Sequence, residues 1–357
     1  MLRGDSVPSF KHDRVTPAQI IILGFLLLIF TGAVLLMLPF STQEPGGASF
    51  GDALFTATSA TCVTGLVLHD TALYWSPFGQ LVILLLIQVG GMGVVTIAVA
   101  IFMFAGKRIG LKQRWVMQES ISAPQVGGIV RMTGFILKTA FLIEGIGALL
   151  LALRFCPQFG LGRGLWYAVF HSVSAFCNAG FDLMGVNSPF SSLTHYVGDP
   201  LVSNVIAFLI IIGGVGFLTW NDIREHKLHF RRYRLQSKLI LTTTLALILT
   251  GLLFFLLYEF EQGQWVDMSL WERINAAFFQ SVTPRTAGFN TVDLTGLSQP
   301  AQLLIILLML VGGSPGSTAG GFKTTTLAVM LLGIRAVFRH KERPQCFGRR
   351  IADESIR

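Results

Sequence analysis

Three short segments of small and polar residues recur along an otherwise apolar chain, and each holds one glycine. The three glycines, Gly65, Gly180 and Gly288, are 115 and 108 residues apart. Glycine lets the backbone adopt left-handed conformations that turn carbonyl oxygens inward, where they can replace the hydration shell of a cation. We call the segments glycine loops 1, 2 and 3, and the residues predicted to line a cation path are Thr61, Cys62, Val63, Thr64 and Gly65, then Cys177, Asn178, Ala179 and Gly180, then Thr286, Ala287, Gly288 and Phe289.

A fourth segment of small residues interrupts the last long apolar stretch. Glycine and proline disfavour a helix by about 1 and 3 kcal/mol per residue, so a continuous helix is not expected there. We predict a flexible loop inside the membrane, below glycine loop 3, that gates the path; a packing kink would need only one such residue. The segment, called the gate segment below, contains Gly312, Gly313, Ser314, Pro315, Gly316, Ser317, Thr318, Ala319, Gly320, Gly321 and Lys323.

The elements that must position these loops follow from apolar periodicity. About 20 apolar helical residues cross a bilayer, whereas stretches of 11 to 13 residues are typical of re-entrant half-helices. Short apolar stretches precede the glycine loops at residues 50–60, 165–176 and 270–282. Full-length spans are predicted at residues 18–40, 78–104, 130–155, 200–220, 238–258 and 301–333. The chain therefore reads as span, half-helix, loop and span, three times over.

Double glycines in the second span of each unit have a simpler interpretation. Small residues allow close packing between membrane helices. We predict this role for Gly90-Gly91 and Gly213-Gly214.

Half-helices that enter the membrane from outside would point their partly negative C-terminal ends toward the membrane centre, which favours a cation over an anion.

Composition excludes an ordinary soluble protein. The 357 residues are 52% hydrophobic and 13% charged, and the mean hydropathy is +0.63. The first apolar run, residues 18–40, is 23 residues without a charge. It is too long for the apolar core of a signal peptide, so we expect a retained membrane helix. The four cysteines lie far apart and are expected to be free thiols.

Basic residues are segregated along the chain. The net charge is +8, but 23 of the 27 lysines and arginines lie in the N-terminal tail, in residues 107–138 and 224–238, and from Lys323 onward. The loops between these segments hold ten acids. The positive-inside rule then predicts a cytoplasmic N-terminus and cytoplasmic basic loops. The charge therefore reports topology and not nucleic-acid binding.

Several charged side chains within or beside the spans need separate interpretations. Lys138 is expected to extend to the cytoplasmic interface, and Glu144 has either a structural partner or a role near the pore. Arg285 would repel cations if it were bare, so we expect it to pair with an acid or with carbonyls. His171 and His195 are expected to be satisfied by neighbours. The sequence shows no nucleotide-binding loop, no Ser, His and Asp set and no metal-ligand spacing, so an enzyme is not expected.

The residues around the glycine loops resemble the Trk/Ktr/HKT superfamily of potassium transporters. The resemblance lies in residues 58–66, 171–181, 285–291 and 312–323, and it is greatest to the KtrB membrane subunits of bacterial Ktr systems. It implies that each unit contributes one filter strand to a single potassium pore with Gly65, Gly180 and Gly288 as the filter glycines. The gate segment then corresponds to the intramembrane gate loop of the family.

The resemblance also implies partners and a location. Members of the family form homodimers that sit on a cytosolic nucleotide-binding regulatory ring, which would meet the basic inner loops here. Potassium uptake across the bacterial inner membrane, with sodium as a candidate coupling ion, is the function implied. The alternative is a membrane subunit that does not conduct and only holds a partner.

One departure from the family concerns the number of units. The family has four, and a fourth filter glycine would lie near position 400. We expect either a truncated sequence record or a separate chain that supplies the rest. The prediction is thus an all-α polytopic membrane protein with three of four units around a pseudo-fourfold cation pore. Its parts are a tail (1–16), unit 1 (17–104), a linker (105–129), unit 2 (130–220), a linker (221–237), unit 3 (238–333) and a tail leading toward unit 4 (334–357).

Overall fold

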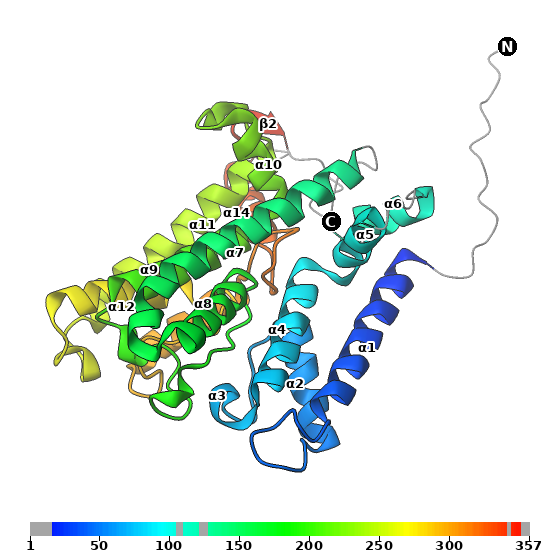
Figure 1. The fold of residues 1–357 in the computed structure, drawn as a ribbon. Coiled ribbons are helices and arrows are strands. Elements are labelled where there is room, and N and C mark those ends of the chain that lie inside the picture. The colour runs from blue at the N-terminus through cyan, green and yellow to red at the C-terminus, as the bar shows by residue number, and fades with distance from the viewer. Residues whose placement is uncertain (1–15, 105–109, 121–127, 341–343, 351–357) are drawn as a thin grey trace.

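A computed structural model describes residues 16–104, 110–120, 128–340 and 344–350. The described part is mainly helical, and its helices fall into three successive groups that lie side by side (Figure 1). The predicted N-terminal tail, apart from Thr16, lies outside the described residues, as do residues 341–343 and 351–357 of the predicted C-terminal tail.

Each group repeats one order of elements: a first helix, a short helix, a glycine loop and an interrupted second helix. The first group holds α1 (Pro17–Leu36), α2 (Phe50–Cys62), α4 (Pro77–Met92) and α5 (Val94–Phe104). The second holds α7 (Ile129–Phe159), α8 (Leu161–Phe176), α9 (Pro200–Val215) and α10 (Phe217–His226). The third holds α11 (Leu235–Phe254), α12 (Leu270–Val282), α13 (Gln299–Leu310) and α14 (Thr324–Phe338).

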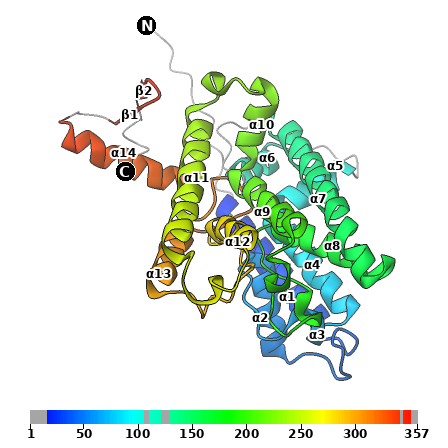
Figure 2. The same cartoon turned by 90° about the vertical axis from the view of Figure 1, so that its left-hand side faces the viewer.

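Short elements lie within these groups, between them and after the last one. They are α3 (Thr71–Tyr74), α6 (Leu111–Ser120), the 3₁₀ turns Met184–Val186, Thr194–Tyr196, Phe230–Arg232 and Gly263–Trp265, a π-helical turn Phe255–Glu259 that extends α11, and the hairpin of β1 (Gln345–Cys346) and β2 (Arg349–Arg350). The two strands pair antiparallel. Figure 2 shows α14 and this hairpin projecting away from the other helices.

Local sequence explains where the helices begin. Ser76, Asp199 and Ser298 cap α4, α9 and α13, and a proline occupies the first turn of each. The cap side chain accepts hydrogen bonds from first-turn amides that have no partner within the helix. Proline in that turn has no N–H group that would need such a partner. The second helix of all three groups therefore starts with the same signal.

Among the described residues, three helices are long and apolar enough to cross a membrane: α1, α7 and α11 with its π-helical turn. Two more spans are bent pairs, because α4 and α5 meet at 98° and α9 and α10 at 94°. The predicted spans over residues 78–104 and 200–220 are therefore present as bent helix pairs, and neither is one continuous helix. The breaks lie at Gly93 and Gly216, whose positive φ angles of 84° and 95° end one helix before the next begins.

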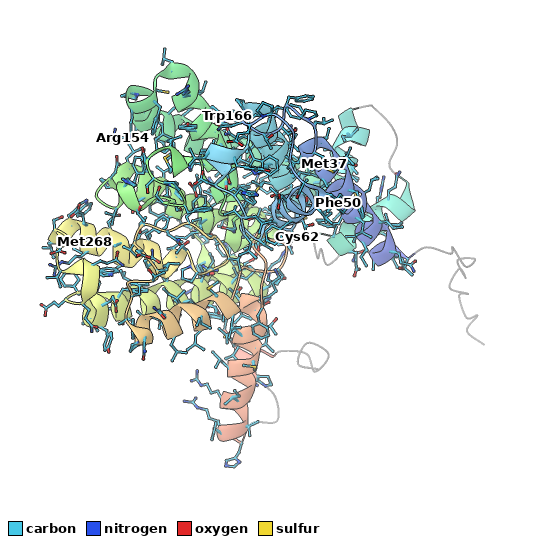
Figure 3. The ribbon with its side chains drawn as sticks, turned by 90° about the horizontal axis from the view of Figure 1, so that it is seen from below. Met37, Phe50, Cys62, Arg154, Trp166 and Met268 are labelled. Atoms are coloured by element: carbon cyan, nitrogen blue, oxygen red, sulfur yellow. The ribbon has the colours of Figure 1, made fainter. Side chains whose placement is uncertain are left out.

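The predicted break in the last span is confirmed, since α13 ends at Leu310 and α14 begins at Thr324. The predicted half-helices are also present as α2, α8 and α12, with α8 beginning earlier than expected. Its start is set by Gly160, where φ of 82° and ψ of 162° reverse the chain directly after α7. Figure 3 shows Cys62, at the end of α2, nearer the middle of the molecule than Phe50 at its start.

Candidate cation site

The three glycine loops share one backbone pattern. Positive φ angles occur at each loop glycine and again two residues before it, and the residue between them has a negative φ. The pairs are Val63 and Gly65 (58° and 74°), Asn178 and Gly180 (57° and 71°), and Thr286 and Gly288 (64° and 82°). Because left-handed backbone is costly for residues with a side chain, its occurrence at the same place in three loops indicates a constrained, repeated structure.

The loops are packed against one another through their backbones. A Cβ atom on Gly65 would lie 2.5 Å from the Ala179 carbonyl oxygen, and one on Gly180 would lie 2.7 Å from the Ala287 carbonyl oxygen. A Cβ on Gly288 would lie 3.2 Å from the Gly180 Cα. Loop 2 therefore lies between loops 1 and 3, and each glycine is needed both for its φ angle and for a neighbour's close approach.

Amides and carbonyls of the loops have different partners. The two amides before each glycine bond back to carbonyls at the end of the preceding short helix in loops 1 and 2, and to carbonyls of the two residues after α12 in loop 3. In loop 1 the amides of Val63 and Thr64 donate to the carbonyls of Ala60 and Ser59. In loop 2 the amides of Asn178 and Ala179 donate to the carbonyls of Ala175 and Ser174. In loop 3 the amides of Thr286 and Ala287 donate to the carbonyls of Pro284 and Thr283. Within the described residues, by contrast, the carbonyl oxygens of residues 63–65, 178–180 and 286–288 accept no hydrogen bond. These oxygens are available to a cation.

A side-chain hydroxyl holds the far end of each loop. It lies five or six residues before the glycine and donates to the carbonyl of the residue just after it. The three bonds are Ser59 Oγ to Leu66 O at 2.7 Å, Ser174 Oγ to Phe181 O at 2.6 Å and Thr283 Oγ1 to Phe289 O at 2.6 Å. Sequence reasoning missed these residues. A hydroxyl at nearly constant distance before each glycine was the available signal.

Polar oxygens of side chains add to the site. Thr61 Oγ1, Asn178 Oδ1 and Thr286 Oγ1 are buried, one in each loop, and have no hydrogen-bond partner in the described part of the chain. Buried polar atoms are usually paired, so each of these unpaired oxygens could accept a further partner. The remaining loop residues differ in exposure, since Cys62 is exposed and Cys177 is buried against Gly91.

The gate segment is tied to the second group by several hydrogen bonds. Its Ser314 and Thr318 amides donate to the carbonyls of Gly214 and Gly213, at 2.9 and 3.3 Å. Thr318 Oγ1 donates to the Phe176 carbonyl at 2.8 Å and accepts from Asn178 Nδ2 at 3.3 Å. The prediction placed this segment below glycine loop 3, but most of its contacts are with the end of α8 and with α9.

Other gate residues hold the segment in its own shape. Gly312 and Gly313 amides donate to the carbonyls of Phe322 and Gly320, which closes the segment on itself. Further bonds join Gly316 O to the Phe217 amide, Ser317 Oγ to Ser314 O and Lys323 Nζ to Ala319 O, and Pro315 and Gly321 lie close to Gly216 and Thr286. The segment thus contacts α9, the start of α10, the end of α8 and glycine loops 2 and 3.

The double glycines provide the space for these contacts. A Cβ on Gly90 would clash with the Thr61 carbonyl oxygen, and one on Gly213 would clash with the Phe176 carbonyl oxygen. Their predicted packing role is confirmed, but the partner is the end of a half-helix and not the side of another span.

The charged residues near the site make few ionic contacts. Glu144 is buried and accepts from Gln88 Nε2 at 3.0 Å, so it has a structural partner on α4. Arg285 is buried, and its hydrogen bond among the described residues runs to the Thr244 hydroxyl at 3.3 Å. The expected pairing of Arg285 with an acid or a carbonyl was therefore wrong. His171 is satisfied as predicted, by the Tyr167 carbonyl at 2.7 Å and the Leu183 amide at 3.2 Å.

One group of possible metal ligands was missed in the sequence. Asp222, Glu225 and His226 on α10 bring three ligand atoms within 4.8 Å of one another. Asp222, however, accepts from the Arg234 amide at 3.0 Å and from Ser237 Oγ at 2.7 Å. Its carboxylate therefore satisfies the free amide end of α11, which explains its burial without a metal.

Comparison with known proteins gives consistent results. The sequence profile of the TrkH family, described as a cation transport protein, matches residues 7–357. The chain is 41% identical over 345 residues to the potassium/sodium uptake protein NtpJ of Enterococcus hirae, with 97% of the chain and 75% of that protein covered. It is 43% identical over 342 residues to the Ktr system potassium uptake protein B of Bacillus subtilis, with 96% and 75% covered.

A solved structure shares the fold. The potassium transporter TrkH of Vibrio parahaemolyticus superposes with a TM-score of 0.68 at 19% identity, over 92% of the chain and 64% of that structure. The chain thus spans about three quarters of the length of the two relatives and less than two thirds of the solved one.

Proposed function

Because the chain belongs to the TrkH family of cation transport proteins, we propose that it carries potassium into a bacterial cell through a pore whose selectivity filter is built by the glycine loops. The relatives named above are potassium or potassium/sodium uptake proteins. The observation that carries the proposal is that the loop amides are hydrogen-bonded within the protein whereas the loop carbonyls are not. Amides bond inward to the half-helices, while carbonyl oxygens stay free.

The mechanism follows from that difference in hydrogen bonding. A potassium ion that enters the loops exchanges water for the free carbonyl oxygens, and the rigid hydrogen-bonded loops keep those oxygens in place. The C-terminal ends of α2, α8 and α12 lead directly into the loops, and the partial negative charge at a helix C-terminus favours a dehydrated cation. The Arg285 side chain donates a hydrogen bond to the Thr244 hydroxyl on α11.

Flow is controlled, in this proposal, by the gate segment. This is supported by its hydrogen bonds with the Phe176 carbonyl at the end of α8 and with Asn178 in glycine loop 2. Opening would break those bonds while the bonds within the segment persist. The segment would therefore move as one piece and leave the filter unchanged.

A further segment closes the ring of loops in this proposal. Loop 2 is buried between loops 1 and 3, whereas Gly288 and Cys62 are exposed and a Cβ on Gly288 would meet only Gly180. A fourth loop, from this polypeptide or from another, fits the open side between loops 3 and 1. A pore with one side open to lipid would not select between ions.

Orientation and partners belong to the same proposal. The distribution of basic residues supports a multi-pass protein of the bacterial inner membrane with a cytoplasmic N-terminus. A homodimer on a cytosolic nucleotide-binding ring is the assembly expected from the family resemblance. Sodium is the candidate coupling ion, since one relative is named a potassium/sodium uptake protein.

Growth at low potassium tests the proposal. The protein, expressed from its own gene in a bacterial strain that lacks potassium uptake, is expected to restore growth at micromolar potassium. A protein that reaches the membrane in normal amount and assembles, but restores no growth and carries no potassium in liposomes, would instead support the scaffold alternative.

A further inference from the structure

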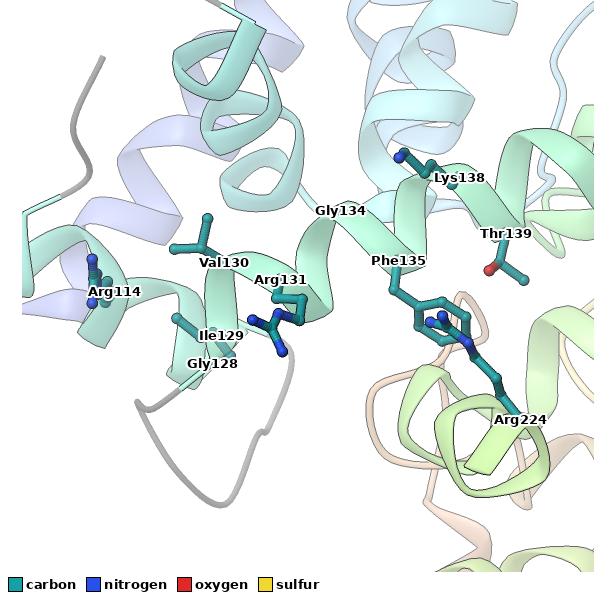
Figure 4. Close-up of a pocket in the computed structure, with 10 residues that line it drawn as sticks. All are labelled: Arg114, Gly128, Ile129, Val130, Arg131, Gly134, Phe135, Lys138, Thr139 and Arg224. Atoms are coloured by element: carbon teal, nitrogen blue, oxygen red, sulfur yellow. The ribbon is translucent and has the colours of Figure 1, made fainter. Parts of the chain in front are cut away.

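A large basic cavity lies far from the glycine loops, at the beginning of α7. Its volume is about 980 Å³, and it is lined by α6, the first three turns of α7 and α10. Its lining residues in the described part of the chain include four cationic side chains and no acid: Arg114, Arg131, Lys138 and Arg224. Figure 4 shows Arg131 and Lys138 on one helix and Arg224 reaching toward Phe135 from another.

The cavity is amphipathic and not simply charged. Phe135, Ile129 and Val130 line it together with the cations. The Arg224 guanidinium lies 4.8 Å from the centre of the Phe135 ring, a contact that holds it over the cavity without neutralising it. Four cations brought together without a carboxylate repel one another, so the site favours an anion.

An apolar stripe continues from the cavity along α7. Residues 131, 135 and 138 occupy one face of the helix. Further steps of three or four residues along the same face reach exposed apolar side chains. These are Leu142 (63% exposed), Ile146 (49%), Leu149 (68%) and Leu153 (67%). Because α7 is long and apolar enough to cross a membrane, this stripe faces hydrocarbon.

We propose that the cavity holds the phosphate headgroup of an anionic phospholipid whose acyl chains lie along the stripe. Arg131 and Lys138 bind the phosphate from α7, and Arg114 and Arg224 close on it from α6 and α10. A soluble phosphate compound would use the cations but not the stripe, so the continuous apolar face selects a lipid. The proposal depends on α7 crossing the membrane and not on which ion the protein carries.

Native mass spectrometry of the detergent-solubilised protein tests the site. The wild type is expected to retain phosphatidylglycerol at concentrations at least about tenfold lower than phosphatidylcholine, because each cation near an anionic headgroup adds to binding. The double variant Arg131→Gln/Lys138→Gln is expected to lose that preference. Its matched control, Arg231→Gln/Arg232→Gln, removes two exposed basic residues outside the cavity and is expected to keep it.

A competition experiment separates a lipid from a soluble phosphate. Glycerol 3-phosphate at lipid-like concentrations is expected not to displace phosphatidylglycerol, and Leu142→Asn/Leu149→Asn is expected to weaken lipid retention with the cations intact. Equal retention in the cavity variant and its control would overturn the site. Displacement by glycerol 3-phosphate would overturn the lipid as its occupant.

Discussion

Three hydroxyl groups determine how the glycine loops end. Ser59, Ser174 and Thr283 each donate to the carbonyl of the residue after the loop glycine. Without that bond the carbonyl would lose its buried partner, and the loop could rotate at the glycine, where backbone freedom is greatest. The free carbonyls inside the loop keep their positions only if both ends of the loop are held.

Removal of one hydroxyl therefore affects selectivity before it affects folding. Ser174→Ala is expected to lower the potassium-to-sodium flux ratio several-fold and to cost about 1 kcal/mol of stability. Ser203→Ala is the matched control, because Ser203 is also buried and donates at 2.7 Å to a carbonyl seven residues away, that of Tyr196. Liposome flux measurements compare the two. An equal loss of selectivity in both variants would show that the bond in loop 2 has no special role.

Residue identities predicted some of the site and not the rest. The loop glycines were predictable because a repeated position with a special backbone requirement is visible in the sequence. The partner of Arg285 was not predictable, because Thr244 lies 41 residues earlier in the chain and on another helix. The Asp222 contacts were missed for the same reason, because they join α10 to the start of α11.

At the scale of elements, the second helix of each group is interrupted where it meets a half-helix. Apolar residues continue through Gly93 and Gly216, so hydropathy alone predicts one long helix in each place. The 98° and 94° bends arise from backbone angles at single glycines. In the third group, by contrast, the run of glycine with proline made the break predictable.

The contact between α8 and α9 depends on Gly213. A methyl group there would meet the Phe176 carbonyl oxygen and Thr318 Oγ1. Gly213→Ala is expected to destabilise the protein by about 1–3 kcal/mol, as overpacking does, and to lower its unfolding temperature in detergent. In the control Gly333→Ala, the added Cβ has no atom within 4 Å and the residue lies inside α14. An unchanged unfolding temperature in Gly213→Ala would contradict the packing.

The gate segment offers a second test at this scale. Thr318→Val removes the hydroxyl that joins the segment to Phe176 and Asn178 but keeps its size. The closed position should lose stability, so potassium flux is expected to rise several-fold at unchanged selectivity. Ser317→Ala removes only bonds within the segment and is the control. A lower flux in Thr318→Val would mean that the bond supports the open path.

For the molecule as a whole, repetition made the fold predictable. Three groups with the same order of elements and the same cap signals were expected from the sequence, and the TrkH fold confirms the class. How the groups pack was not predictable, because loop 2 contacts both neighbours through backbone atoms that no residue pattern reveals.

The most direct test of the filter is the flux ratio between potassium and sodium for the assembled protein in liposomes, measured for the wild type and for Gly288→Ser. Gly288 has φ of 82° and its added Cβ would contact only Gly180, so the change alters the filter with little overpacking. We predict at least a tenfold preference for potassium in the wild type and a ratio near one in the variant. An unchanged ratio in a folded variant, or sodium preference in the wild type, would contradict the account.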